Sequence, residues 1–291
     1  MSLPTFLRRS LVVTAAVSAV ALLASCSSAG GPAATAVADG CEPVHEGLDT
    51  YTDGTLTVGV PENLPYTQTS GSDASGLEID LVKRMADAEC FAVSFVPITY
   101  ANGVPMISEQ KRADIITGGW YVTEARAEQV GFTSPTFYDS MGIVSADGAT
   151  TVDELEEIGA VGSGAGFSWE ADMSAVLGSD LKVYPGTIEM KQDLASGRIQ
   201  AALDGYAVAV AAYADTDLVV EQAAEDDRIA ITTEKPTIAF PVAKENTALS
   251  DALSELIDGY REDGTLAELL ADYDLPADLL IPADVAAGSI R

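Results

Sequence analysis

The chain has 291 residues, of which 47% are apolar, and a formal net charge of −30 at pH 7. That length allows one large or two modest domains, and that apolar content is ample for a hydrophobic core, which argues against global disorder. The acidic balance argues against nucleic-acid binding and against unaided binding to anionic lipid, because both reward clustered Lys and Arg. We expect the charge to serve the solubility of an exported protein.

The N-terminus has the pattern of a secretory signal. Arg8 and Arg9 precede an apolar run at 11–24 that is too short for a comfortable membrane span. Leu23-Ala24-Ser25-Cys26 resembles the lipobox of bacterial lipoproteins. We therefore expect a signal peptide at 1–25 and lipidation of Cys26, followed by a flexible tether up to residue 50, since 27–40 is small, polar and rich in Gly and Ala. An ordinary signal peptide with a chance cysteine is the alternative.

Two further cysteines, Cys41 and Cys90, remain for pairing. The compartment implied by the signal is oxidising, so a disulfide between them is allowed. It would tie the mature N-terminus to the end of the first helix and stabilise the fold by about 2–4 kcal/mol. Two buried free thiols are the alternative. We expect no metal site and no cofactor, because the only histidine, His45, has no ligand-like spacing.

The first half of the body alternates strands and helices. Apolar runs predict strands at 55–60, 93–98 and 113–118, with helices after Gly76 and at 104–110. This order, with short links, predicts a parallel, doubly wound α/β lobe.

The segment 118–135, GGWYVTEARAEQVGFTSP, carries the main binding-site candidates. Glycines at the carboxyl end of a parallel strand let the backbone approach a ligand closely. Thr123 is the expected N-cap of a short helix. Arg126 then follows one turn later with five fixed donors suited to a carboxylate. The alternative is a surface arginine paired with Glu124 or Glu128.

A second series of strands and helices follows a crossover strand predicted at 141–145. The turn 164–169, GAGFSW, opens a helix whose free N–H groups favour an anion, but it is not a nucleotide fingerprint. A strand at 198–204 ends in Asp204, which is well placed to bind an ammonium group. Its alternative role is the N-cap of the helix that starts near Tyr206.

The segments 229–233 and 237–243 are predicted to return the chain to the first lobe. We expect lobe 1 to comprise 51–143 and 236–276, lobe 2 to comprise 144–235, and 277–291 to be a poorly ordered tail. Two crossovers make a hinge, so closure around a ligand is expected.

The glycine pair, Thr123 and Arg126, followed by Phe132-Thr133-x-Pro135, resemble the ligand motif of the bacterial extracellular solute-binding proteins of family 3, the amino-acid receptors of ABC importers. The resemblance covers roughly 55–275. It implies a two-lobed periplasmic-binding-protein-like α/β fold with two hinge crossovers. The site residues that it implies are Arg126 on the ligand carboxylate, the backbone at Gly119, Asp204 on the amino group, and the turn at Phe167 and Ser168.

Aromatic residues also match ligand-facing positions of the family, although core packing is the alternative for both Tyr66 and Tyr100. Tyr121 and Phe167 depart from the family, which usually has hydroxyl side chains there; Ser168 could substitute. Aromatic faces beside Asp204 suit a cationic or quaternary-ammonium group, whereas Arg126 calls for a carboxylate. We therefore expect a small zwitterionic ligand, either a standard amino acid or a compatible solute such as ectoine or a betaine. The bland alternative is that some rings simply fill space. The ring candidates are Tyr66, Tyr100, Trp120, Tyr121, Phe167 and Trp169.

These patterns predict a monomeric, lipid-anchored receptor on the outer face of the cytoplasmic membrane that delivers its ligand to ABC permease subunits. An enzyme on the same scaffold is the second reading, since cyclohexadienyl dehydratases resemble this family. It would need an extra acid or base, for which only Asp204 and Glu78 are candidates, so we expect no enzyme. A signalling or surface-interaction protein that kept the fold is the third.

Overall fold

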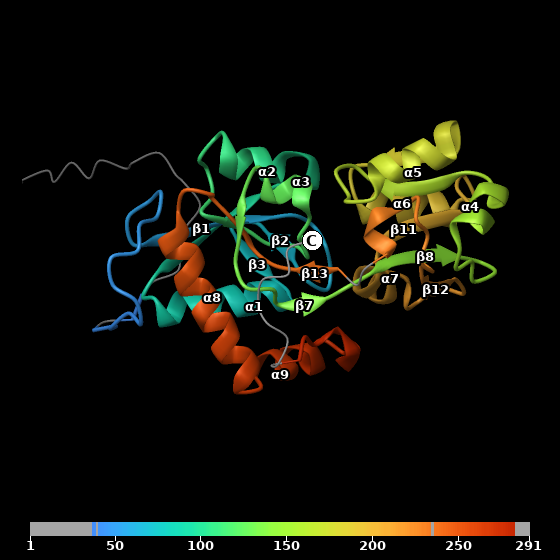
Figure 1. Ribbon diagram of the computed structural model, residues 1–291. Coiled ribbons are helices and arrows are strands. Elements are labelled where there is room, and N and C mark those ends of the chain that lie inside the picture. Colours follow the sequence, from blue (N-terminus) through green and yellow to red (C-terminus); the bar gives the residue numbers. More distant parts are fainter. Residues whose placement is uncertain (1–36, 39, 234–235, 283–291) are drawn as a thin grey trace, which may run out of the picture. The chain divides into compact units, whose positions relative to one another are not determined.

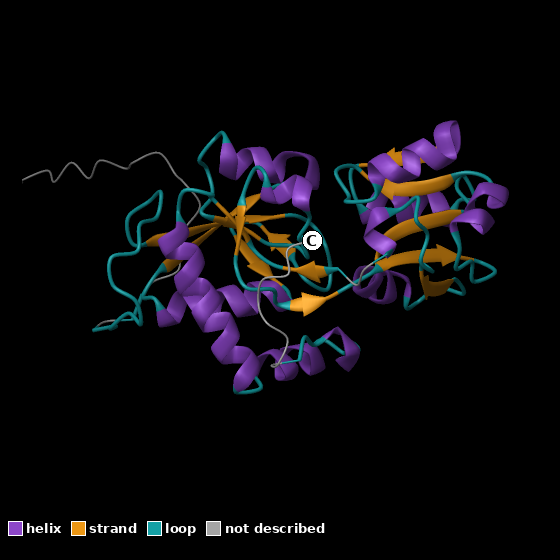
Figure 2. Ribbon diagram, in the orientation of Figure 1, coloured by secondary structure: helices purple, strands orange, loops and turns teal. Residues whose placement is uncertain are grey.

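The computed structural model describes residues 37–38, 40–233 and 236–282 (Figure 1). The predicted signal peptide, Cys26 and residues 27–36 and 39 of the predicted tether lie outside these residues. Within them, two five-stranded sheets are each covered by helices (Figure 2). We call the part built on the first sheet lobe 1 and the part built on the second sheet lobe 2. Across the part of the chain that is described, none of the helices combines the length and the apolar character needed to span a membrane.

Lobe 1 has the strand order β4-β1-β5-β14-β6. β1 runs parallel to β4 and β5, whereas β14, which returns from lobe 2, is antiparallel to β5 and β6. The predicted parallel sheet is therefore mixed, because the returning strand enters it from the opposite direction. The strands of lobe 1 are β1 (Thr55–Val60), β2 (Gln68–Ser70), β3 (Asp73–Ser75), β4 (Ala92–Pro97), β5 (Ile115–Ile116), β6 (Gly131–Phe132), β7 (Phe137–Tyr138), β13 (Thr237–Ile238) and β14 (Pro241–Val242).

The helices of lobe 1 bury one apolar face each. In α1 the side chains of Leu77, Leu81 and Met85 are fully buried, as the helical spacing predicts. Gly76 precedes α1 at φ 122°, and a Cβ there would lie 2.3 Å from the carbonyl oxygen of Tyr66. The helices are α1 (Leu77–Ala88), α2 (Tyr100–Ser108), α3 (Glu124–Ala127), α8 (Thr247–Glu262), α9 (Thr265–Asp272) and the 3-10 turn η3 (Ala277–Leu279).

The predicted start of α2 at residue 104 was wrong. The helix already begins at Tyr100, with Thr99 as its N-cap, and the Asn102 side chain accepts a hydrogen bond of 2.9 Å from the Thr99 backbone N–H. Pro105 lies inside the helix. Because Pro105 has no backbone N–H, the helix continues through it with one hydrogen bond fewer.

Lobe 2 has the strand order β10-β9-β11-β8-β12. β9 runs parallel to β10 and β11, and β8 is antiparallel to β11 and β12. β8 thus lies wholly in the sheet of lobe 2, so the predicted boundary at 143 comes too late, and β12 was not predicted. The elements are β8 (Met141–Ser145), α4 (Val152–Ile158), β9 (Val161–Gly164), α5 (Glu170–Leu177), η1 (Gly178–Asp180), β10 (Leu181–Tyr184), α6 (Thr187–Ala195), β11 (Ala201–Gly205), α7 (Tyr206–Tyr213), β12 (Val219–Gln222) and η2 (Ala230–Thr232).

The two crossovers between the lobes lie side by side. β7 and β13 pair as antiparallel strands, with Thr237 opposite Tyr138 and Ile238 opposite Phe137. The backbone N–H of Asp139 extends this ladder by donating to the carbonyl of Pro236 at 3.0 Å. The predicted two-crossover architecture is therefore confirmed.

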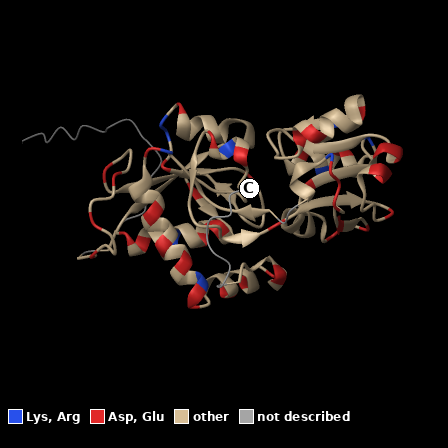
Figure 3. Cartoon of the chain, viewed as in Figure 1, with Lys and Arg blue, Asp and Glu red and all other residues tan. Residues whose placement is uncertain are grey.

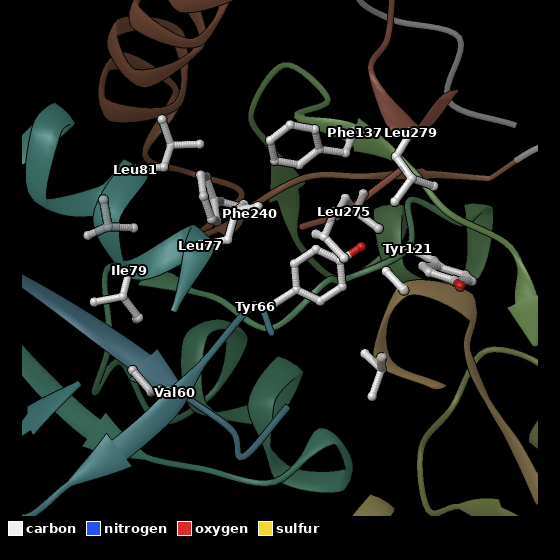
Figure 4. Packing of buried hydrophobic residues seen from close by; sticks show 14 of the residues in the cluster. Val60, Tyr66, Leu77, Ile79, Leu81, Tyr121, Phe137, Phe240, Leu275 and Leu279 are labelled. Atoms are coloured by element: carbon white, nitrogen blue, oxygen red, sulfur yellow. The ribbon is translucent and has the colours of Figure 1, made fainter. Parts of the chain in front are cut away.

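The segment after α9 differs from the predicted disordered tail. Leu279 and Ile281 are only 1% and 3% exposed, and Leu280 forms a β-bridge with Phe137. Figure 4 shows Leu279 near Phe137 in the core of lobe 1. Apolar residues in the segment outweigh its two prolines, so the chain up to residue 282 belongs to lobe 1.

The predicted disulfide between Cys41 and Cys90 is present, with their Cα atoms 5.8 Å apart. It joins the segment before β1 to the chain just after α1. Figure 3 shows acidic residues along the helices of both lobes, with few basic residues among them.

Candidate functional site

A small pocket lies between the two lobes and is lined by side chains from both of them. Most predicted site residues line it, and residues close to the two crossovers complete it. The lining residues are Asn63, Tyr100, Gly119, Tyr121, Arg126, Asp139, Phe167, Ser168, Trp169, Asp204, Gly205 and Val208.

Arg126 is the only Lys or Arg among the lining residues. Thr123 caps α3 as predicted, since its side chain accepts from the Arg126 backbone N–H. The guanidinium donates to the carbonyl oxygens of Tyr121 at 2.8 Å and Gly166 at 3.2 Å. No carboxylate of the described chain lies within 4.0 Å of it, so the alternative pairing with Glu124 or Glu128 is absent.

The electrostatics of Arg126 favour an anionic partner. Burial lowers the pKa of the guanidinium to about 10, which leaves it charged at neutral pH. The guanidinium carbon Cζ lies 4.8 Å from the centre of the Trp120 ring, and this contact holds the side chain in place. A half-buried cation that has only carbonyl partners leaves its charge uncompensated. A ligand carboxylate would supply the missing charge.

The glycine pair is held by Glu78, which sequence analysis treated only as a possible acid. The backbone N–H groups of Gly118 and Gly119 donate to the Glu78 carboxylate at 2.5 and 3.1 Å. Both glycines have positive φ, and a Cβ at Gly118 would lie 2.3 Å from Pro61. These amides are therefore occupied within the protein, and only the Gly119 surface faces the pocket. Burial raises the pKa of Glu78 to about 7.

The glycine-rich turn of lobe 2 is also internally satisfied. The N–H groups of Ala165 and Phe167 donate to backbone carbonyls, and that of Gly166 donates to Glu170 at 2.5 Å. The prediction that this turn offers free N–H groups to an anion therefore does not hold for these three amides. Phe167 and Ser168 nevertheless line the pocket, as predicted.

Aromatic rings form a continuous wall that passes from one lobe to the other. Tyr100 contacts Trp120 at 4.9 Å and Phe167 at 5.2 Å between ring centres. Trp169 continues the wall, at 5.3 Å from Phe167 and 5.9 Å from Tyr121. The Tyr121 hydroxyl donates to the Ser140 carbonyl at 2.7 Å. The rings therefore pack against one another while four of them also line the pocket.

Tyr66 does not line the pocket, contrary to the prediction. It is 1% exposed and lies in the core of lobe 1, between Leu77 and Tyr121 in Figure 4. Its hydroxyl donates to Asp139 at 3.4 Å, from behind the pocket wall. Core packing, the alternative reading, describes this side chain better.

Asp204 lies at the end of β11 as predicted and is 1% exposed. It accepts hydrogen bonds from the Thr187 hydroxyl at 2.5 Å and from the backbone N–H of Gly205 at 2.9 Å. It does not cap α7, whose N-cap is Gly205 without a side-chain bond. Burial raises the pKa of Asp204 to about 7. The carboxylate therefore faces the pocket without a cation of its own.

Sequence analysis missed Asp139, which lies between β7 and β8 and is 1% exposed. Its carboxylate accepts from the N–H groups of Ser140 at 2.9 Å and Ala207 at 3.3 Å. Burial raises its pKa to about 6. The one available signal was an acidic residue amid the apolar and small residues of the crossover. Asn63 also lines the pocket.

No group of three or more His, Cys, Asp or Glu side chains within the described ranges could hold a metal ion. The pocket therefore combines one arginine, buried carboxylates and aromatic rings. Such a set suits a small molecule with opposite charges at different ends.

Sequence comparison decides the family. The profile described as bacterial extracellular solute-binding proteins, family 3, matches residues 56–275. The chain belongs to this family. No curated protein sequence matches this family 3 protein closely enough to count as a relative.

Many solved structures share the fold of this family 3 solute-binding protein. The cysteine-binding protein from Campylobacter jejuni is 22% identical, with a TM-score of 0.68 over 79% of this chain and 96% of that chain. An ancestral arginine-binding protein bound to arginine is 26% identical, with a TM-score of 0.65 over 76% and 98%. The ancestral amino acid-binding protein AncCDT-1, a precursor of cyclohexadienyl dehydratase, is 24% identical, with a TM-score of 0.65 over 76% and 95%.

Proposed function

We propose that this protein is the receptor of an ABC importer and binds an amino acid or a similar zwitterion between its two lobes. The single observation that supports this most strongly is Arg126, a cation at the pocket with no acidic partner among the described residues. Two nitrogens of its guanidinium group donate to backbone carbonyl oxygens at 2.8 and 3.2 Å. These bonds orient the group without neutralising its charge. A ligand carboxylate completes this arrangement.

The amine end of the ligand belongs at Asp204. This carboxylate lines the same pocket, is 1% exposed and receives only neutral donors from the protein. A buried carboxylate without a cation is stabilised by an incoming ammonium group. The aromatic wall then covers the remainder of the ligand and excludes water. Amino-acid binding by structural relatives, stated for the cysteine- and arginine-binding proteins, supports the same class of ligand.

Lipidation of Cys26 is part of the proposal. It would anchor the protein to the outer face of the cytoplasmic membrane, where the tether lets the lobes reach the permease subunits. The support is the sequence pattern before Cys26 and membership of an extracellular family. Metabolic labelling with a fatty acid tests it: label should appear in the wild type and be lost in Cys26→Ser.

Calorimetric titration tests the ligand class. The protein without residues 1–26 is unfolded in denaturant under oxidising conditions, refolded to remove carried ligand, and titrated with the standard amino acids, ectoine and glycine betaine. Binding of an amino acid with micromolar or lower Kd supports the proposal. Binding by ectoine or betaine alone would change the substrate to a compatible solute. Absence of binding across the panel would contradict an amino-acid receptor.

A second candidate, an enzyme on the same scaffold, draws on the two pocket carboxylates. Burial raises the pKa of Asp139 to about 6 and that of Asp204 to about 7, which suits general acid–base chemistry. The likeness to a precursor of cyclohexadienyl dehydratase points the same way. Recovery of the ligand after long incubation separates the two functions, since a receptor returns it unchanged.

A further inference from the structure

The lining of the pocket contains two carboxylates but only one cation, Arg126. Asp139 and Asp204 both line it and are each 1% exposed. Within the described part of the chain, neither forms an ion pair with Lys, Arg or His inside 4.0 Å. A ligand with one ammonium group would neutralise only one of these two carboxylates.

Asn63 provides a separate observation. Its Nδ2 donates to the Gly118 carbonyl at 3.0 Å, which orients the side-chain amide and leaves Oδ1 as the available acceptor. That oxygen is buried and has no hydrogen-bond partner, and the residue is 7% exposed and lines the same pocket. A buried acceptor without a donor destabilises the protein. A donor on the ligand would satisfy it.

The two carboxylates flank one backbone position, Gly205. Its N–H donates to Asp204 Oδ1 at 2.9 Å, and Asp139 Oδ2 lies 2.9 Å from the point that a Cβ on Gly205 would occupy. Asn63 connects to this group through Gly119, whose added Cβ would contact the Tyr66 ring at 3.0 Å and Asn63 Nδ2 at 3.7 Å. The Tyr66 hydroxyl in turn donates to Asp139. Asn63 and Asp139 thus line the same pocket, with Gly119 and Tyr66 between them.

We infer that the ligand carries a second positive charge, held by Asp139 and Asn63, so that the substrate class is an amino acid with a basic side chain. This rests on the proposed function, in which Arg126 and Asp204 hold the carboxylate and the α-amino group. Arg126, Asp204 and Asp139 would then face the ligand's carboxylate, its α-amino group and its basic side chain, respectively. The neighbouring rings of Tyr121 and Trp169 favour a cation as well.

Protonation supplies an independent readout in the unaltered protein. Burial raises the pKa values of Asp139 and Asp204 to about 6 and about 7, so both carboxyls are partly protonated near neutral pH in the absence of a ligand. The negative charges of Glu78 and Asp139 repel each other, and this repulsion also raises the pKa of Glu78. The Tyr66 hydroxyl donates to Asp139, whereas the Tyr121 hydroxyl donates to the Ser140 carbonyl. A cationic ligand favours the ionised carboxylates, so its binding releases protons.

Matched pairs of amino acids test the inference in the refolded protein. Arginine is compared with citrulline, and lysine with norleucine, because each pair differs mainly in one positive charge. We expect at least one basic member to bind 10-fold or more tightly than its neutral counterpart. Neutral members that bind as tightly as the basic ones would overturn the inference and leave the proposed function standing. Absence of binding by every amino acid would overturn both.

Titration in two buffers of different ionisation enthalpy counts the protons exchanged. We expect arginine or lysine to release protons and the neutral counterpart to release fewer. Equal proton exchange within each pair would contradict a second cation subsite. This measurement needs no variant and is therefore independent of any change in folding.

Variants locate the subsite. Asp139→Asn should reduce the ratio of basic to neutral affinity 10-fold or more. The control, Asp114→Asn, alters a carboxyl that is 2% exposed and bonded to the N–H groups of Tyr51 and Thr57, outside the pocket, and should keep the ratio. If Asp139→Asn does not fold, Asn63→Leu should reduce the ratio several-fold. An unchanged ratio in every folded pocket variant would overturn the assignment.

Discussion

The carboxylate of Asp139 accepts a hydrogen bond of 3.3 Å from the backbone N–H of Ala207, which lies 68 positions later in the sequence. Asp139 belongs to the crossover between the lobes, and Ala207 lies in the first turn of α7. The side chain therefore satisfies an N–H group that no residue of α7 itself caps. One residue of the hinge thus joins the start of a lobe 2 helix to the wall of the pocket.

The contribution of this bond is measured by comparing two substitutions. Asp139→Ala leaves the N–H groups of Ser140 and Ala207 without their acceptor, whereas Asp139→Asn keeps one side-chain oxygen for them. We expect Asp139→Ala to be less stable than Asp139→Asn by about 1–2 kcal/mol in urea unfolding. Equal stabilities would mean that the hydrogen bond to α7 contributes nothing measurable.

Buried carboxyls should make the ligand-free protein more stable in mild acid. Burial raises the pKa of Glu78 and Asp204 to about 7 and that of Asp139 to about 6, above the ordinary values of 4.5 for Glu and 3.8 for Asp. Between pH 4 and pH 7 the folded state therefore binds more protons than the unfolded state, and stability falls as pH rises. A tenfold difference in acidity between the folded and unfolded states corresponds to about 1.4 kcal/mol of stability.

Thermal unfolding at pH 5 and pH 8 measures this effect. We expect a higher Tm at pH 5, and a smaller difference between the two pH values in Asp204→Asn, which cannot ionise. Repulsion among surface acids acts equally in both proteins, so the comparison isolates Asp204. The same pH dependence in wild type and variant would show that the buried carboxyl does not titrate in this range.

Close packing at the glycine pair should make Gly118 intolerant of a side chain. Gly118→Ala places a Cβ 2.3 Å from Pro61 Cγ at a backbone φ of 114°. Gly71→Ala is the matched control, since its φ is also positive, at 65°, but nothing lies within 4 Å of the added atom. We expect the control to lose about 1 kcal/mol from backbone strain and Gly118→Ala to lose clearly more. Similar losses in urea unfolding would rule out the steric contact with Pro61.

The disulfide should matter for stability and not for binding. Cys41 and Cys90 are 49 positions apart and lie outside the pocket. Replacing both by serine should lower the free energy of unfolding by about 2–4 kcal/mol. Ligand affinity at 25 °C should stay within about twofold, provided that circular dichroism shows a folded protein. A large loss of affinity would indicate that the segment before β1 influences the pocket.

Local signals accounted for much of the fold. The buried run of β1, the apolar face of α1 and the Thr123 cap depend on neighbouring residues, so the sequence alone was enough to predict them. The two remaining cysteines offered only one pairing. The resemblance of the segment at 118–135 to one family then supplied the two-lobed architecture.

Long-range contacts explain what the sequence could not show. Glu78 accepts hydrogen bonds from the backbone amides of Gly118 and Gly119, which lie 40 and 41 positions later in the sequence. Asp139 accepts a hydrogen bond from Ala207, which lies 68 positions later. Neither relationship leaves a local pattern. Tyr66 illustrates the converse, because a match to a ligand-facing loop did not reveal that Leu77 and its neighbours bury the ring in the core.

The most direct test of the proposed binding mode combines Arg126→Ala with removal of the ligand's carboxylate. Calorimetry compares the best-binding amino acid with its carboxamide, in wild type, in Arg126→Ala and in Arg112→Ala, which alters an exposed arginine outside the pocket. We expect the carboxamide to bind at least 30-fold more weakly than the amino acid in wild type and in the control, in line with about 2 kcal/mol or more for a buried charge pair. In Arg126→Ala both compounds should bind weakly and with similar Kd. If Arg126→Ala still prefers the amino acid as strongly as wild type does, Arg126 does not hold the carboxylate.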